Sequence, residues 1–194
     1  MRHNKTLKIT IMAMMIALCY IGANFLKVDI PLPFGATKFH LGNTFCILAA
    51  LMLGGTYGGL AGAIGMSLGD LFDPMYIASA PKTMILKFII GFIAGSVAHK
   101  VFKITEDNTS NLKLKTFVSA GCGAFANILI EPSVSYLYYK FILGMSEKAA
   151  GAFASAKLIT ISTNAVLATI IAPILYFGVK STFVDKNKFK ELSK

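Results

Sequence analysis

Six long apolar stretches, separated by short polar breaks, fill most of this 194-residue chain. They cover approximately residues 7–26, 36–53, 57–72, 83–102, 114–138 and 152–179. A helix needs roughly 20 mostly apolar residues to cross the hydrocarbon core of a bilayer. The stretches are continuous, whereas the strands of a membrane barrel alternate apolar and polar residues. We therefore predict an all-α membrane protein with six transmembrane helices in one compact bundle, forming a single domain over residues 1–194.

The distribution of lysine and arginine predicts how this bundle is oriented. Twelve of these residues lie around the start of the first stretch, around the break between the fourth and fifth, and after the sixth, but only five lie in the connections on the opposite side. Because cytoplasmic loops are enriched in both residue types, both termini are expected in the cytoplasm. The net charge of +10 then reflects topology and contact with anionic lipid headgroups, and no nucleic-acid partner is expected. The basic start followed by an apolar run resembles a secretory signal, but the run is long enough for a retained first helix.

Two missing enzyme motifs and the positions of the cysteines limit the chemistry that this chain can perform. The sequence has no H-E-x-x-H pair of a metalloprotease and no P-loop lysine of an ATPase. Cys19, Cys46 and Cys122 are scattered through apolar stretches, which favours core packing over a disulfide or a zinc site. We predict a protein that is not an enzyme and holds no metal and no cofactor. Uphill transport would then take its energy from an ion gradient or from a partner.

Polar side chains inside the predicted helices are the candidates for a binding site. A charge at the membrane centre costs roughly 2.5–3.5 kcal/mol on insertion scales, so these residues need partners or a cavity. Asn127 and Glu131 share a helix face, and Lys157, Thr160 and Asn164 form a comparable stripe. Both stripes fall in the outer half of the membrane, which predicts a polar pocket that opens outward. The candidate substrate-binding residues are His40, Asn43, Asp73, Tyr76, Lys87, Asn127, Glu131, Lys157 and Asn164.

Several of these candidates also have a purely structural interpretation. Glu131 and a buried lysine could form an ion pair that only locks the bundle. Asp73, like Asp70, could be a cap or turn residue where the third stretch ends. His40 could lie at the membrane interface without a ligand. Tyrosines such as Tyr76 are common at membrane interfaces in any case.

The connections between the stretches carry further signals. Residues 54–59 form a glycine-rich turn, and glycines 58, 62, 65 and 69 continue along one face of the next predicted helix. Because no lysine followed by serine or threonine comes after them, we expect close packing between helices and not a phosphate-binding loop. The proline-containing connection 28–35 is expected to be extended, and Pro74 and Pro81 interrupt the helical pattern after the third stretch.

Taken with its length, these features make the chain resemble the substrate-binding S components of energy-coupling factor (ECF) transporters, the vitamin importers of bacteria and archaea. The resemblance covers nearly the whole chain. It is carried by the Ala13-xxx-Ala17 pair in the first helix and by Lys38-Phe-His-Leu-Gly-Asn43. The glycine hairpin 54–69 and the passage 70–87 complete it.

The resemblance implies a function and a set of partners. An S component binds one micronutrient in an outward-facing pocket, and it docks through the face that carries Ala13 and Ala17 onto a transmembrane coupling subunit with two cytoplasmic ATPases. The chain would then be a multi-pass protein of a bacterial or archaeal cytoplasmic membrane, in contact with membrane lipids. The alternative is a solitary proton-coupled secondary transporter of a small polar metabolite, with Glu131 or Asp70 as the carboxylate.

The resemblance leaves the vitamin open. Arg2 directly after Met1 departs from nickel and cobalt members, and the lack of tryptophan departs from thiamine binders. Riboflavin, a pyridoxine or hydroxymethylpyrimidine ring, pantothenate, folate and a queuosine precursor all remain candidates.

Overall fold

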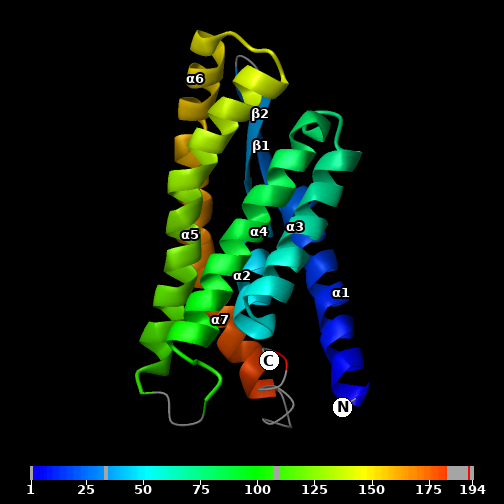
Figure 1. Cartoon of the computed structure of the whole chain (residues 1–194), viewed down its shortest axis with the longest axis vertical. Helices are drawn as coiled ribbons and strands as arrows, with labels where there is room; N and C mark the ends of the chain where they lie inside the picture. Colours follow the sequence, from blue (N-terminus) through cyan, green and yellow to red (C-terminus); the bar gives the residue numbers. More distant parts are fainter. Residues whose placement is uncertain (1, 33–34, 107–109, 183–191, 193–194) are drawn as a thin grey trace.

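A computed structural model describes residues 2–32, 35–106, 110–182 and 192, and it shows a bundle of helices with one small β-hairpin (Figure 1). In chain order the elements are α1 (Arg2–Asn24), β1 (Lys27–Leu32), β2 (Gly35–His40), α2 (Gly42–Leu53), α3 (Gly55–Phe72), a 3₁₀ turn (Ile77–Ser79), α4 (Ala80–Ser96), a π-helical turn (Val97–Val101), α5 (Leu112–Leu137), a second π-helical turn (Tyr138–Ile142), α6 (Glu147–Ala156) and α7 (Leu158–Thr182).

Four helical segments in the described part of the chain are long and apolar enough to cross a membrane. They are Lys5–Asn24, Ile77–Val101, Leu112–Ile142 and Glu147–Thr182, and they coincide with the first, fourth, fifth and sixth predicted stretches. The other two stretches correspond to α3, with 18 residues, and to the shorter apolar helix α2, with 12. The fold is therefore mostly helical, as predicted, but its helices are unequal in length.

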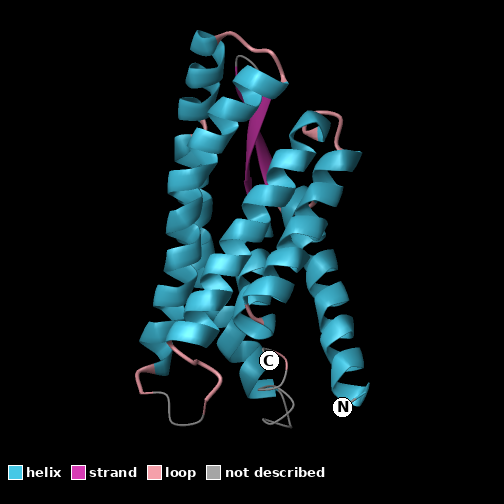
Figure 2. Ribbon diagram, in the orientation of Figure 1, coloured by secondary structure: helices cyan, strands magenta, loops and turns pink. Residues whose placement is uncertain are grey.

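The second predicted stretch, 36–53, is wrong in its first part. Residues 36–40 belong to strand β2, which pairs antiparallel with β1 so that Lys27 lies opposite His40 and Ala36 opposite Pro31. Figure 2 shows this hairpin as the one pair of strands beside the helices. The strand was missed because residues 36–40 mix apolar and polar side chains over a short segment that leads directly into an apolar stretch, and periodicity alone does not identify so short an element. The predicted extended connection is correct for residues 28–32 and 35, and residues 33–34 lie outside the described residues.

Helix α2 forms the centre of the bundle. Every residue from Cys46 to Leu53 is buried, and α2 contacts α1, α3, α4, α5 and α7. With 12 residues, α2 is too short to cross the hydrocarbon core of a bilayer. A short helix is possible at this place because other helices, and not lipid, surround it.

Close helix packing accounts for the glycines of α3, as predicted. A β-carbon on Gly58 or Gly62 would collide with α2, and one on Gly65 or Gly69 would collide with α1. Gly54, with φ = 82°, forms the turn that reverses the chain between α2 and α3. The small residues thus let α3 approach both α1 and α2 closely.

The sixth predicted stretch is divided. Lys157 ends α6 and α7 begins at the next residue, so the stretch is two consecutive helices. The start of α1 and the end of α7 lie at one end of the bundle, whereas the β-hairpin and the connection between α5 and α6 lie toward the opposite end (Figure 1).

Candidate functional site

A buried polar cavity of about 60 Å³ lies between the hairpin and the helices. Strand β2, the start of α2, the end of α3, the first turns of α4, the middle of α5 and the α6–α7 junction all contribute to it. Its lining residues are Thr37, Lys38, His40, Asn43, Met66, Asp70, Tyr76, Ser79, Lys82, Thr83, Lys87, Glu131, Lys157, Thr160, Ile161 and Asn164. So many polar groups inside an apolar bundle indicate a site built for a polar ligand.

Seven of the nine candidate residues line this cavity: His40, Asn43, Tyr76, Lys87, Glu131, Lys157 and Asn164. The other two do not. Asp73 lies at the hairpin's edge, where it accepts a hydrogen bond from the backbone N–H of Met75, as a turn residue does. Asn127 is buried in α5, and neither polar atom of its side-chain amide has a hydrogen-bond partner among the described residues.

One ion pair connects the hairpin with α3. The Lys38 ammonium donates to Asp70 Oδ1 over 2.8 Å, and the Thr83 hydroxyl donates to Asp70 Oδ2 over 2.6 Å. The Lys38 nitrogen also lies 4.1 Å from the centre of the Tyr76 ring. Asp70 is therefore more than a helix cap, because it joins β2, α3 and α4 at one wall of the cavity.

A second ion pair connects α4 with α5. The Lys87 ammonium lies 3.2 Å from Glu131 Oε2, and both side chains are largely buried. Lys87 is thus the buried lysine that pairs with Glu131. Because charges inside a bundle need partners, the pair holds two helices together at the wall of the cavity.

Helix α7 binds the backbone of the hairpin. The Asn164 side chain donates to the Lys38 carbonyl over 3.0 Å and accepts from the His40 N–H over 3.1 Å. The hydroxyls of Thr37 and Thr160 share a hydrogen bond of 2.7 Å. A strand whose partner is a single neighbour has free polar groups on its other edge, and Asn164 satisfies two of them. The position of β2, and with it Lys38, thus depends on α7.

Two further lysines meet at one tyrosine. Lys157 donates to Tyr139 Oη over 2.6 Å, and Lys82 donates to the same oxygen over 3.1 Å and to Ser135 Oγ over 2.9 Å. Lys82 comes from the first turn of α4, and Lys157 from the α6–α7 junction. The break at Lys157, which the apolar pattern did not reveal, coincides with this contact.

The outer edge of the hairpin is held by charges outside the membrane-spanning segments. Lys27 donates to Asp73 over 2.6 Å and lies 3.1 Å from Asp29, which accepts a hydrogen bond from the Tyr76 hydroxyl. Partial burial alone would lower the pKa of Lys27, but its bonds to Asp73 and Asp29 raise it above the usual value. Burial would raise the pKa of Asp73, yet the Lys27 hydrogen bond lowers it. The pair is therefore charged at neutral pH and fastens β1 to the connection between α3 and α4.

The tyrosine and the histidine at this end stay neutral. Burial and the hydrogen bond to Asp29 raise the pKa of Tyr76 above its usual range. Burial and then the charge of Lys87 lower the pKa of His40 to about 3. The neutral His40 ring accepts a hydrogen bond at Nδ1 from the Gly42 N–H over 3.1 Å. His40 therefore lines the cavity as a neutral imidazole at the start of α2, and it does not lie free at the membrane surface.

Sequence reasoning left several lining residues out of the candidate set: Thr37, Lys38, Met66, Asp70, Ser79, Lys82, Thr83, Thr160 and Ile161. Lys38 and Lys82 are two of the five basic residues that the sequence analysis placed in connections opposite the termini, where lysines are ordinarily solvated. Neither had a local signal. The strand that puts Lys38 on the same face as His40 was not predicted, and five positions along a helix turn Lys82 away from the face of Lys87.

A G-x-S-x-G pattern occurs at residues 65–69 but forms no nucleophile elbow. That motif needs its serine on a strained turn between a strand and a helix. Ser67 instead lies inside α3, and its hydroxyl donates to the Ile64 carbonyl over 3.3 Å. The flanking glycines contact α1, so the pattern reflects helix packing.

No group of three or more His, Cys, Asp or Glu side chains is placed to hold a metal ion within the described ranges. Cys19 and Cys46 are buried in the core, and Cys122 is partly buried. All three are free thiols. The chemistry that the cavity offers is hydrogen bonding and charge.

Comparison with known proteins identifies the class. A solved structure, the S component for biotin from an ECF-type ABC transporter, has the same fold, with a TM-score of 0.59 and 18% sequence identity over 90% of this chain and 93% of that chain. The family model of the ECF-type riboflavin transporter S component matches residues 3–181. A search of the curated proteins found no match. The fold is thus that of an S component. The chain belongs to the ECF-type riboflavin transporter S component family, a family of transporter subunits and not of enzymes.

Proposed function

We propose that this protein is the high-affinity vitamin-binding subunit of an ECF-type importer in the cell membrane. The observation that carries the proposal is the buried cavity, where hydrogen-bonding and charged groups from β2, α2, α4, α5 and α7 converge inside an apolar bundle. Family membership supports the same function. A transmembrane coupling subunit and two cytoplasmic ATPases would supply the energy.

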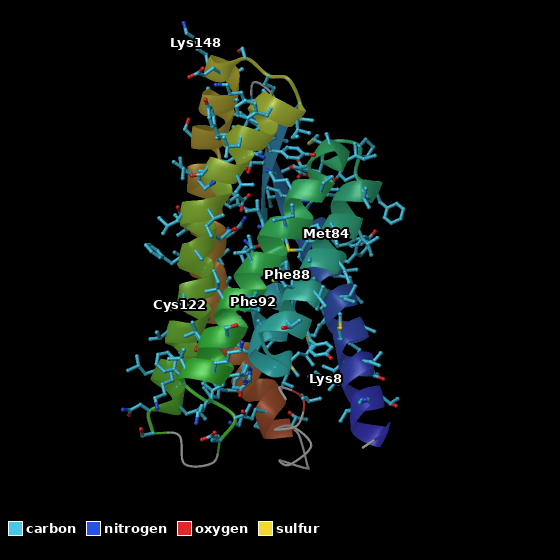
Figure 3. The ribbon with its side chains drawn as sticks, viewed as in Figure 1. Lys8, Met84, Phe88, Phe92, Cys122 and Lys148 are labelled. Atoms are coloured by element: carbon cyan, nitrogen blue, oxygen red, sulfur yellow. The ribbon has the colours of Figure 1, made fainter. Side chains whose placement is uncertain are left out.

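The proposed topology has six membrane-embedded segments and cytoplasmic termini, with α6 and α7 together forming the last segment. Support comes from the start of α1 and the end of α7, which lie at the same end of the bundle, away from the hairpin (Figure 1). In Figure 3, the basic residue Lys8 lies toward the end of the bundle where α1 starts. The sequence also supports this orientation through Lys186, Lys188, Lys190 and Lys194, which lie outside the described residues.

Ligand binding has to enlarge the cavity. Sites for drug-sized ligands have volumes of roughly 300–1,000 Å³, against about 60 Å³ here. A vitamin would therefore displace side chains that now bond one another, in particular Lys38 and Lys87 from their carboxylates. We propose that it is held by the lining residues His40, Asn43, Tyr76, Lys87, Glu131, Lys157 and Asn164, and that Asn127 and Asp73 take part only if the cavity enlarges toward them. Riboflavin is the first ligand to test, because the matching family is named for it.

The docking face proposed on α1 is exposed. Ala13 and Ala17 both lie on the outer surface of the helix, beside the exposed side chains of Met14 and Ile21. Small residues four positions apart leave a flat patch onto which another helix can pack closely. This patch is where the coupling subunit is expected to bind.

A solitary proton-coupled transporter needs a carboxylate that is free to gain and lose a proton. Asp70 and Glu131, the two proposed carriers, each lie within 3.2 Å of a lysine nitrogen. The arrangement therefore favours the binding subunit. Proteoliposomes with this chain alone should show no uptake driven by a pH gradient.

Native mass spectrometry of the purified full chain tests the proposal. After extraction into mild detergent, with neither nucleotide nor an ion gradient present, we expect the protein to retain one bound vitamin or to bind one from a panel led by riboflavin. Isothermal titration calorimetry should then give a dissociation constant below about 1 µM. Failure to bind any water-soluble vitamin would contradict the proposal.

A further inference from the structure

The charges that line the cavity do not balance. Four lysines and two carboxylates are among its lining residues, so they contribute a net charge of +2, and His40 adds none because it is neutral. Lys38 pairs with Asp70 and Lys87 with Glu131. Lys82 and Lys157 make up the excess. Among the described residues, no carboxylate lies within 4.0 Å of either of their nitrogens.

These two lysines are deeply buried, with 4% and 7% of their surfaces exposed. Their hydrogen-bond partners are hydroxyl groups: that of Tyr139 for both, and that of Ser135 for Lys82. The Lys157 nitrogen also lies 4.4 Å from the centre of the Phe153 ring. These contacts satisfy the ammonium groups without placing a carboxylate beside either of them. A buried charge without a counter-charge is costly and is retained where function needs it.

The two nitrogens are also close together. Their distances to Tyr139 Oη, 2.6 and 3.1 Å, limit their separation to at most 5.7 Å. A single carboxylate or phosphate can accept a hydrogen bond from each of two ammonium groups at such a separation, and hydrogen bonds between charged groups are the strong ones. Both lysines line the cavity and come from different elements, so a bound anion would join α4 to the α6–α7 junction.

We propose that Lys82 and Lys157 bind an anionic group of the ligand, a carboxylate or a phosphate. This inference rests on the proposed vitamin-binding function and adds a substrate class to it: a small compound that carries a carboxylate or a phosphate. The polar groups of α7 and β2 are left to recognise the uncharged part.

Matched pairs of ligands that differ in this charge test the proposal. The full-length protein in nanodiscs is titrated with riboflavin and riboflavin 5′-phosphate, with biotinamide and biotin, and with panthenol and pantothenate. We expect the charged member of at least one pair to bind about 10- to 100-fold more tightly than its neutral partner, because hydrogen bonds to charged groups carry that much affinity. The first pair reports on a phosphate and the others on a carboxylate.

Lysine variants show which residues cause the preference for the charged ligand. Lys82→Met and Lys157→Met should each reduce the affinity ratio between the charged and the neutral ligand to less than threefold, and Lys82→Arg should keep most of that ratio. Lys148→Met removes an exposed lysine at the outer tip of α6 (Figure 3) and serves as the control for net charge. Because the measured quantity is a ratio between two ligands, a general loss of packing would not change it in this pattern.

The outcomes separate the two proposals. Neutral members that bind as tightly as the charged ones would overturn this inference and leave the vitamin-binding function intact. A preference for the charged ligand that persists in both Lys82→Met and Lys157→Met would also overturn this inference. Binding of none of the six compounds, nor of any other vitamin in the panel, would overturn the proposed function and this inference with it.

Discussion

The double variant Ala13→Trp/Ala17→Trp is expected to abolish vitamin uptake while leaving vitamin affinity unchanged. Both alanines lie on the exposed face of α1, and neither lines the cavity. Two indole rings would keep a partner helix several ångströms from the surface that small residues leave open. Uptake is measured in cells that express the coupling subunit and the ATPases, and affinity is measured on the purified chain.

The matched control for this variant is Ile170→Trp/Ile174→Trp. These residues have the same spacing and are about half exposed on α7. The control should retain most of the uptake, because it places the same bulk on a face to which we assign no partner. If affinity fell together with uptake in the α1 variant, or if the α7 variant lost as much uptake, the docking role of α1 would be wrong.

Replacing Lys87 with methionine is expected to lower the free energy of unfolding by about 3–5 kcal/mol. The reason is that the Glu131 carboxylate, 3.2 Å from the lysine nitrogen, would remain buried without its counter-charge. Thermal unfolding of the detergent-purified protein measures the loss. Lys103→Met, in the exposed pair with Glu106, should cost less than about 1 kcal/mol.

The double variant Lys87→Met/Glu131→Leu separates structure from function. Well-packed apolar residues often replace a buried ion pair at little cost, so this protein should recover most of the lost stability. It should not recover vitamin binding, because two cavity groups are missing. A double variant that binds the vitamin normally would show that the pair only locks α4 to α5.

The helices were predictable because their apolar runs are long and continuous. The glycine stripe was predictable as well, since four small residues at helical spacing have few uses in a membrane other than close packing. Seven of the nine candidate residues line one cavity because a polar side chain in an apolar helix has few alternatives to facing other polar groups.

The features that the sequence did not predict depend on contacts between distant segments of the chain. Strand β2 was predicted as the start of a helix because it is short and leads directly into an apolar stretch. The Asn164 side chain that holds it comes from α7, far away in the sequence. Nothing in the local sequence marks the break at Lys157, which has no proline or glycine beside it. The assignment of Lys38 and Lys82 to solvated connections failed for the same reason: only the folded hairpin and the α3–α4 connection bury them.

Reconstituted uptake tests the central claim most directly. Proteoliposomes are prepared with this chain alone and with this chain together with the coupling subunit and both ATPases, and uptake of the radiolabelled vitamin found by native mass spectrometry is followed with and without ATP. We predict accumulation only when all subunits and ATP are present. Accumulation by this chain alone, driven by a pH gradient, would contradict the account.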